Sequence, residues 1–430
     1  MKYICSVCGY MSLKPLGRCP NCGEWDTFVE EGKREKGGKL KVIKLKDVKI
    51  KENLRIDTGI EGVNRVLGGG LVKGSAVLLG GSPGVGKSTL FLQIANNLNA
   101  YGYKVLLVSA EESVHQVKQR AERLKINLDV EITEETNIDY VLNGAEGYDV
   151  IFVDSIQAVY TSDLNSPPGS ISQVRFCADK LFKFAKTTNT TVLLSGHITK
   201  SGVIAGPKTL EHLVDVVLYL EGEKGNMLRI LRAEKNRFGP TDEISFFVME
   251  EAGLLSIEDP SRYFYTPSDI PKIGVAYTIT LKGSIPMVLE VQALVHNTFY
   301  PVPLRHSVGY DPKRLAIVLA LLEKLLNYKF AKTDVYINIG GGIKTDDSFI
   351  DMAVCSSIIS SLRNIPLDNA GIFIGEISLT GEFKSPINLE VRENEGKRVG
   401  FKRIYSAKPG RILEWFEVKN LKDLNSVISP

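Results

Sequence analysis

The strongest chemical pattern in the sequence is a glycine-rich stretch that ends in a lysine and two hydroxyl residues. It fits G-x4-G-K-[ST], in which backbone N–H groups surround a phosphate, the lysine reaches the β- and γ-phosphates, and the hydroxyl binds Mg²⁺. An apolar run typical of a buried strand precedes the stretch and a helical pattern follows it, so we expect a nucleoside triphosphate site rather than a chance turn. The predicted nucleotide-binding residues are Gly81, Ser82, Pro83, Gly84, Val85, Gly86, Lys87, Ser88 and Thr89.

Three further polar residues follow apolar runs that are typical of strands, at the edge where ligands bind in parallel sheets. Glu111 is placed to orient or deprotonate the water that attacks the γ-phosphate, whereas the helix dipole is enough to explain its neighbour Glu112. Asp154 is predicted to hold Mg²⁺ together with the Ser88 hydroxyl. His197 is predicted to sense the γ-phosphate. Lys87, Glu111, Asp154 and His197 form the core of the expected catalytic set, which also includes Lys235 and Arg237.

Four cysteines near the N-terminus have the spacing of a metal site. Cys5 and Cys8 form one CxxC pair, Cys19 and Cys22 form a second, and ten residues separate the pairs. Four thiolates so spaced can close a tetrahedral Zn²⁺ site. Two disulfides or a redox CxxC are the alternatives, but cytosolic disulfides are rare and a redox pair needs no second pair. We therefore expect a closed structural zinc site without catalysis.

The order of elements predicts a mostly parallel α/β sheet, because strand-like and helix-like segments alternate from Arg55 to about Glu258. The Ser113-x2-Gln116 pair predicts a capping box at the start of one of these helices. A length of 430 residues favours two or three domains. A composition of 43% apolar and 24% charged residues is ordinary for a globular protein.

The sequence gives no indication of a membrane partner or of secretion. It contains no run of 18 apolar residues, and its first residues lack the apolar region of a signal peptide. A cytoplasmic location is therefore expected. The net charge of +3 says little about nucleic acid, but residues 32–55 hold ten Lys/Arg against three Asp/Glu. A solvated linker and a nucleic-acid contact both explain that segment.

Two further groups of cations are candidates for binding phosphates. Lys200 and Lys208 lie in a glycine-containing loop without apolar periodicity, which suits a DNA backbone. Lys235 and Arg237 belong to the pentad Lys-Asn-Arg-Phe-Gly after a predicted strand. These cations could complete a neighbouring subunit's site, as an arginine finger does, or form a plain surface turn. The residues alone leave both possibilities open.

Several segments together resemble the RadA (Sms) family of bacterial DNA-repair ATPases, which are paralogues of RecA. They are the four-cysteine ribbon, Leu67–Leu71 (LGGGL), Ser109–Ser113 (SAEES), Val153–Gln157 (VDSIQ), Gly196–Lys200 (GHITK), Ala205–Pro207 (AGP), Leu210–His212 (LEH) and the pentad at residues 235–239. The resemblance covers nearly the whole chain and implies a hexameric, ATP- and Mg²⁺-dependent motor. Such a motor moves on single-stranded DNA and extends strand exchange at branched recombination intermediates, alongside a RecA-type recombinase. It also implies a catalytic role for Glu111, and roles for Lys235 and Arg237 across the subunit interface or on DNA.

From about Pro271 onward the chain resembles, more distantly, the proteolytic domain of Lon. The serine and lysine that Lon uses align with Phe349 and near Val391, and the neighbouring Arg392 cannot act as a base. The resemblance therefore implies a non-proteolytic scaffold of α+β, ribosomal S5 type 2-like fold. The expected domains are a zinc finger (1–30), a basic linker (31–55), a RecA-like ATPase domain (56–258), a linker (259–271) and the Lon-like domain (272–430).

Two other function classes compete with a DNA-stimulated ATPase. An ATP-dependent protease or chaperone is suggested by the Lon-like half, and it predicts proteolysis that depends on one Ser/Lys pair. A small-molecule kinase is compatible with the phosphate-binding stretch alone. The kinase hypothesis leaves the cysteine ribbon and the Lys-Asn-Arg-Phe-Gly pentad unexplained.

Overall fold

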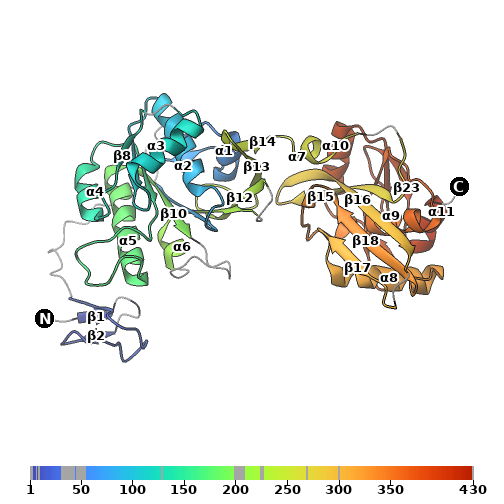
Figure 1. Cartoon of the computed structure of the whole chain (residues 1–430), viewed down its shortest axis with the longest axis horizontal. Helices are drawn as coiled ribbons and strands as arrows, with labels where there is room; N and C mark the ends of the chain where they lie inside the picture. The colour runs from blue at the N-terminus through green and yellow to red at the C-terminus, as the bar shows by residue number, and fades with distance from the viewer. Residues whose placement is uncertain are drawn as a thin grey trace. The chain divides into compact units, whose positions relative to one another are not determined.

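The computed structural model describes residues 3–5, 7, 10–30, 44, 55–126, 129–197, 209–222, 227–267, 270–298 and 301–428. The chain divides into two compact units, Met1–Ser256 and Ile257–Pro430. Each unit is built on its own large sheet (Figure 1). Among the described residues, no helix has both the length and the apolar content that crossing a membrane requires.

Two small sheets precede the main sheet of the first unit. The cysteine-rich segment forms an antiparallel sheet of order β2-β1-β3, with β1 at Tyr3–Cys5, β2 at Met11–Ser12 and β3 at Phe28–Glu30. Farther along the chain, β4 (Arg55–Ile56) pairs antiparallel with β5 (Leu71–Val72). This second pair holds the start of the main α/β core against the turn that follows α1 (Glu61–Leu67).

The main sheet of the first unit has nine strands in the order β14-β13-β12-β11-β6-β10-β9-β7-β8. The six strands from β11 to β8 in that order are parallel, and β12 and β13 continue antiparallel. This confirms the predicted mostly parallel α/β core. The strands are β6 (Ala76–Gly81), β7 (Val105–Ser109), β8 (Glu131–Thr133), β9 (Val150–Asp154), β10 (Thr191–His197), β11 (Val216–Glu221), β12 (Leu228–Asn236), β13 (Ile244–Glu250) and β14 (Gly253–Ile257).

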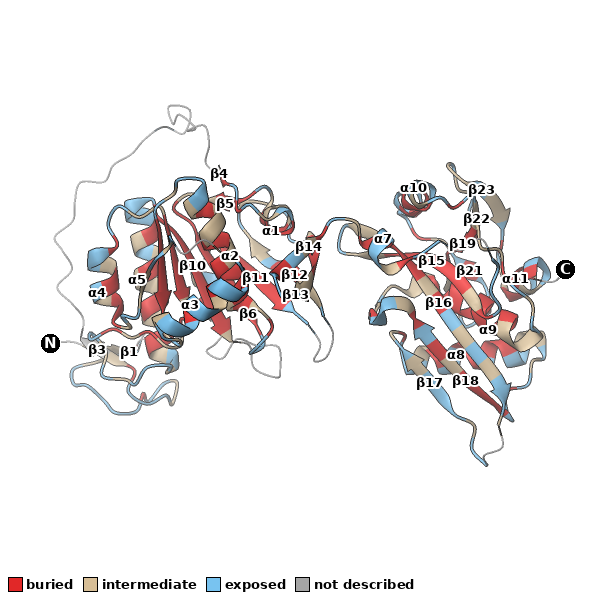
Figure 2. Ribbon diagram, turned by 45° about the horizontal axis from the view of Figure 1, so that its top comes forward, coloured by how far each residue is buried: buried red, intermediate tan, exposed pale blue. Residues whose placement is uncertain are grey.

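Helices cover both faces of this sheet, so the central strands are buried on both sides (Figure 2). Alternate residues of β6 divide between two cores: Val77 and Leu79 pack with α1, α2 and α3, whereas Ala76 and Leu78 pack with α4, α5 and α6. The predicted Ser113–Gln116 capping box at the start of α3 is present. The remaining helices are α2 (Lys87–Ala100), α3 (Val114–Arg123), α4 (Ile138–Gly144), α5 (Ile171–Thr188) and α6 (Thr209–Leu213).

The second unit is a seven-stranded mixed sheet of order β17-β18-β16-β15-β19-β22-β23, which confirms a separate α+β domain. The long hairpin of β15 (Val275–Lys282) and β16 (Ile285–Asn297) packs against the buried helix α9 (Asp351–Arg363). The other strands are β17 (Arg305–Val308), β18 (Thr333–Ile339), β19 (Gly371–Phe373), β22 (Arg403–Ser406) and β23 (Glu414–Glu417), with a separate pair β20 (Glu376–Ile377) and β21 (Phe383–Lys384). The other helices are α7 (Pro260–Phe264), α8 (Pro312–Leu326), α10 (Leu389–Val399) and α11 (Leu421–Ile428).

Candidate active site

The predicted phosphate-binding residues form the turn between β6 and α2. Gly84 and Gly86 adopt positive φ angles of 77° and 117°, a region that favours glycine. A Cβ on Gly86 would lie 2.6 Å from Met249 Cε, so the backbone also needs the space. Gly86 is the N-cap of α2, and no side chain in the described part of the chain caps that helix. The N–H groups of its first turn, which includes Ser88, therefore remain as donors for an anion.

Lys87 lies at the centre of the site and its side chain is buried. Its ammonium donates to the carbonyl oxygens of Gly81 (2.9 Å) and Ser82 (3.2 Å) and lies 3.3 Å from His197 Nδ1. Burial lowers the pKa of Lys87, while the nearby carboxylates of Asp154 and Glu111 act in the opposite direction. The Lys87 ammonium thus contacts the imidazole of His197 and lies near the carboxylates of Asp154 and Glu111.

The carboxylates of Asp154 and Glu111 lie at the carboxyl edge of two neighbouring parallel strands. Asp154 is the last residue of β9, and Glu111 lies two residues beyond the end of β7. Glu111 accepts a hydrogen bond from the Ser155 hydroxyl and lies 3.1 Å from His197 Nε2. Asp154 accepts a hydrogen bond of 2.5 Å from Ser195 Oγ. The structure therefore brings Lys87, Glu111, Asp154 and His197 together at one sheet edge.

Glu112, next to Glu111, has a different environment. One of its carboxylate oxygens lies 2.5 Å from Nη2 of Arg120, a residue of α3. The two adjacent glutamates therefore have different partners. Glu111 contacts His197 and Ser155, whereas Glu112 pairs with Arg120 of α3.

Three residues that sequence reasoning missed support this site. Ser155 and Ser195 each donate to one of the carboxylates, and their positions at strand ends were the available signal. Arg229, on β12, donates from Nε to the carbonyl oxygen of Val85 at 3.0 Å and so ties the phosphate-binding turn to the antiparallel part of the sheet. No local pattern marks Arg229, because its partner is 144 residues away.

The pentad begins inside β12 rather than after it, since that strand extends to Asn236. The Lys235 ammonium donates to the carbonyl oxygens of Glu211 and Val214, each at 2.7 Å, at the end of α6. The Arg237 guanidinium lies 3.3 Å from Asp215 Oδ1. Among the described residues, neither cation hydrogen-bonds to the phosphate-binding turn or to the catalytic set of the same subunit. Lys200 and Lys208, the other predicted DNA-binding cations, lie outside the described residues.

A single arginine joins the pentad to the glycine turn that precedes β5. Arg55 Nη1 donates to the carbonyl oxygens of Leu67 (3.0 Å) and Gly70 (3.1 Å), and its Nη2 donates to that of Phe238 (2.6 Å). The Asn236 amide adds a bond of 3.3 Å to the Leu67 carbonyl oxygen. Two motifs that are far apart in the sequence thus form one hydrogen-bonded cluster, which we call the Arg55 clasp.

The cysteine ribbon has the geometry of a zinc site. The sulfurs of Cys5, Cys19 and Cys22 all lie within 4.8 Å of one another, and those of Cys5 and Cys22 are 3.6 Å apart. Tetrahedral Zn²⁺ with Zn–S bonds of about 2.3 Å places sulfurs about 3.8 Å apart, so these three ligands fit. Cys8, the fourth predicted ligand, lies outside the described residues. Thr27 Oγ1 lies 3.1 Å from Cys5 Sγ, within hydrogen-bonding distance of that sulfur.

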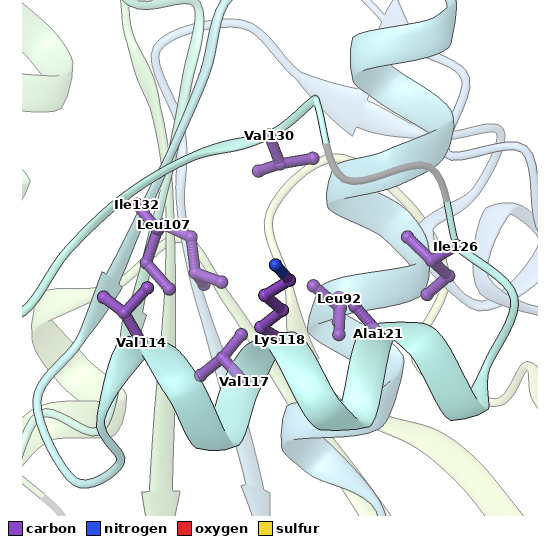
Figure 3. Close-up of a pocket in the computed structure, with 9 residues that line it drawn as sticks. All are labelled: Leu92, Leu107, Val114, Val117, Lys118, Ala121, Ile126, Val130 and Ile132. Carbon is purple, nitrogen blue, oxygen red and sulfur yellow. The ribbon is translucent and has the colours of Figure 1, made fainter.

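Among the hollows in the described part of the chain, two border α2 and α3. One of about 570 Å³ lies beside the start of α2 and is lined by Thr89, Arg123, Leu124, Met227, Met249, Glu250, Glu251 and Gly253. The other, of about 230 Å³, lies between α3 and the neighbouring strand and helix, and is apolar apart from Lys118 (Figure 3). Since its lining contains no histidine or carboxylate, the second hollow lacks groups for acid–base chemistry. The chemistry is concentrated at the sheet edge.

In the second unit, the two positions aligned with the Lon dyad carry no reactive pair. The ring of Phe349 lies 5.5 Å from the guanidinium carbon of the buried Arg392, which forms an ion pair of 2.7 Å with Asp347. Val391 is 43% exposed. A guanidinium cannot accept a proton from a serine, so Arg392 cannot act as the base of such a pair.

Two segments of the first unit match known protein families. A family model for KaiC-type ATPases matches residues 56–147, and one described as the rubredoxin metal binding domain matches residues 3–30. The chain is 42% identical to the DNA repair protein RadA of Bacillus subtilis, covering 94% of this chain and 91% of that protein. It is also 42% identical to RadA of Rickettsia conorii, over 99% of each chain. The structure of the KaiC-like protein PH0186 from Pyrococcus horikoshii aligns with 47% of the chain at 20% identity and a TM-score of 0.40.

Proposed function

Because the chain belongs to the family of the DNA repair protein RadA, we propose that it is a DNA-stimulated ATPase that translocates on single-stranded DNA. In this proposal, ATP hydrolysis drives branch migration and so extends strand exchange at recombination intermediates. The KaiC-type ATPase region supports ATP as the nucleotide. The similarity to DNA repair proteins supports DNA as the partner.

The observation that carries the ATPase proposal is the continuous chain of contacts from Lys87 through His197 to Glu111. The γ-phosphate lies at the Lys87 ammonium, and Glu111 orients the attacking water and accepts its proton. The Ser155 hydroxyl fixes the carboxylate in that orientation. As water attacks, the bond between the γ-phosphorus and the bridging oxygen breaks, and ADP and inorganic phosphate leave.

His197 is suited to report whether the γ-phosphate is present. Its two ring nitrogens contact the phosphate-binding lysine on one side and the catalytic glutamate on the other. The γ-phosphate competes with His197 for the Lys87 ammonium, so hydrolysis alters the position of the imidazole. His197 is the last residue of β10. The segment that follows it in the sequence contains Lys200 and Lys208, which we assign to the DNA backbone.

The residues present fit two metals. Ser88 and Asp154 would hold Mg²⁺, which neutralises phosphate charge when bound. The cysteine ribbon would hold a structural Zn²⁺ that stabilises a segment too small to fold on a core of its own.

We assign the remaining parts to assembly. Arg237 is half-exposed and is the candidate for completing a neighbouring subunit's site in a ring, by analogy a hexamer. Lys235 supports it from within the same subunit, since its ammonium is engaged by the end of α6. The second unit serves as a non-proteolytic scaffold, because Phe349 and Val391 stand where Lon has its reactive pair and the neighbouring Arg392 cannot act as a base. A RecA-type recombinase is the proposed protein partner.

ATP turnover measured with and without single-stranded DNA, over a series of salt concentrations, tests this proposal. Turnover should rise with DNA, and the effect should weaken steeply with salt because counterions are released on binding. Glu111→Gln should lower kcat by about 10²–10⁴-fold, as for loss of a general base. Glu112→Gln is the matched control, since the Glu112 carboxylate pairs with Arg120. Indifference to DNA, or equal damage from both glutamine variants, would refute the assignment.

A further inference from the structure

Asp215 is a buried carboxylate with no place in the proposed hydrolysis. It is 2% exposed and lies between α6 and β11. Its Oδ2 accepts from the Ala76 N–H (3.0 Å) and from the Lys186 ammonium (2.8 Å), while its Oδ1 lies 3.3 Å from the Arg237 guanidinium. Each oxygen therefore has its own partners, and two cations compensate the buried charge.

The main chain repeats the same connection. The Arg237 N–H donates to the Asp215 carbonyl oxygen at 3.2 Å, and the Asp215 N–H donates to the Ala76 carbonyl oxygen at 3.0 Å. Ala76 is the first residue of β6, the strand that leads into the phosphate-binding turn. Asp215 thus fixes the backbone on which Arg237 stands as well as the side chain.

The Arg237 side chain is 51% exposed, although the Asp215 side chain beneath it is buried. A guanidinium has five N–H donors, and Asp215 is the one acidic side chain of the described residues that pairs with it. Because half of the side chain is exposed, the remaining donors are accessible to a partner group while Asp215 stays buried. This differs from an ordinary surface arginine, which loses side-chain entropy whenever it enters an interface.

Lys186 completes the arrangement from α5. Its ammonium lies 5.4 Å from the ring centroid of Phe182 and 5.9 Å from that of Phe238, the residue after Arg237. The lysine therefore contacts both the carboxylate that holds the guanidinium and the pentad turn.

We propose that Asp215 is the positioning residue for Arg237, and that with Lys186 it presents the guanidinium outward, already oriented, to the nucleotide site of a neighbouring subunit. The inference rests on the proposed function, in which Arg237 acts in trans. It adds that Asp215, although bonded to the strand of its own phosphate-binding turn, contributes to catalysis at the neighbour's site.

ATPase assays on mixtures of two variants distinguish an effect of Asp215 on its own subunit's nucleotide site from an effect on the neighbouring subunit's site. Asp215→Asn should bind ATP with unchanged affinity and lose most turnover, and Lys87→Ala should be inactive alone. In an equimolar mixture, about a quarter of the interfaces pair an intact phosphate-binding turn with an intact Arg237, so turnover should reappear. A mixture of Lys87→Ala with Arg237→Ala is the reference for action in trans.

Each result decides the matter. Restoration with Asp215→Asn to the level of the Arg237→Ala reference supports the proposal. Restoration with Arg237→Ala but not with Asp215→Asn overturns it, because Asp215 then acts on its own strand through Ala76. Wild-type turnover of Asp215→Asn alone also overturns it. Failure of the reference mixture refutes the trans role in the proposed function, and the inference with it.

A second variant keeps the test usable where Asp215→Asn does not fold, which circular dichroism would show. Lys186→Met leaves the carboxylate in place and removes a half-exposed cation. It should lower turnover several-fold at unchanged ATP affinity and regain turnover in the mixture with Lys87→Ala. Unchanged turnover of folded Lys186→Met, or no regain in the mixture, would again overturn the assignment.

Discussion

Gly86→Ala should destabilise the first unit more than Gly84→Ala, although both glycines lie in the same turn and both have positive φ angles. At Gly84 a Cβ would meet no atom within 4 Å, so only backbone strain is added, about 1–2 kcal/mol. At Gly86 a Cβ would lie 2.6 Å from Met249 Cε and 3.1 Å from Leu254 Cδ1. Overpacking costs about 1–3 kcal/mol, and the lower end applies because a methionine terminus moves easily. The expected totals are therefore about 1–2 kcal/mol for Gly84→Ala and about 2–3 kcal/mol for Gly86→Ala.

Calorimetry can measure this difference in the full chain, in the unfolding transition that added nucleotide shifts to higher temperature. Met249→Ala provides the second step, since it removes the nearest contact and leaves the backbone strain. In that background the cost of Gly86→Ala should fall toward that of Gly84→Ala, with a remainder from Leu254. Equal costs for the two glycine variants, or no relief from Met249→Ala, would show that packing against β13 and β14 does not shape this turn.

Three further predictions concern the metal, a buried thiol and the turn. Removal of zinc with a strong chelator should expose the ribbon cysteines to thiol reagents and leave ATP affinity unchanged; lost ATP affinity would contradict a purely structural metal. Burial raises the pKa of the Cys177 thiol to about 12, so iodoacetamide at pH 8 should label it only after denaturation. Because that pKa is raised in the folded state, its contribution to the free energy of unfolding is complete below about pH 8.5 and decreases as the pH rises toward 12. Labelling of the native thiol would show that the site opens. Arg229→Met should raise the KM for ATP about tenfold, as expected for loss of a charged hydrogen bond, and Arg229→Lys should raise it less; a fall in kcat at constant KM would instead place Arg229 in the chemical step.

Contiguous patterns in the sequence predicted the fold and the local geometry well. The mostly parallel sheet followed from the periodicity of apolar residues. The capping box followed from Ser113 and Gln116, whose side chains reach each other's backbone N–H because they are three residues apart. The convergence of Glu111, Asp154 and His197 followed from the rule that parallel strands end at one edge. Their exact roles remain predictions.

Contacts between distant segments could not be predicted in the same way. Periodicity states which face of a strand is buried, but not which carbonyl oxygen a given arginine reaches. Arg229 and Arg55 both bond to backbone oxygens, which every residue carries, so neither partner has a compositional signal. The sequence predicts a shorter strand before the pentad for a related reason. The residues Ala-Glu-Lys-Asn at its end are uncommon in strands, yet β12 extends over nine residues, Leu228–Asn236.

The Arg55 clasp has a mechanical consequence. Arg55 begins β4, the first element of the described ATPase core, so a force that pulls on the chain ahead of Arg55 is applied at that residue. Three carbonyl oxygens on two separate turns share the load, and β4 itself adds only a two-residue pairing. When the ribbon is held by a partner and pulled, the force therefore reaches the turn that carries Phe238 and, one residue away, Arg237. Optical tweezers that pull on the ribbon should find a lower rupture force in Arg55→Lys, whose single ammonium cannot span both turns.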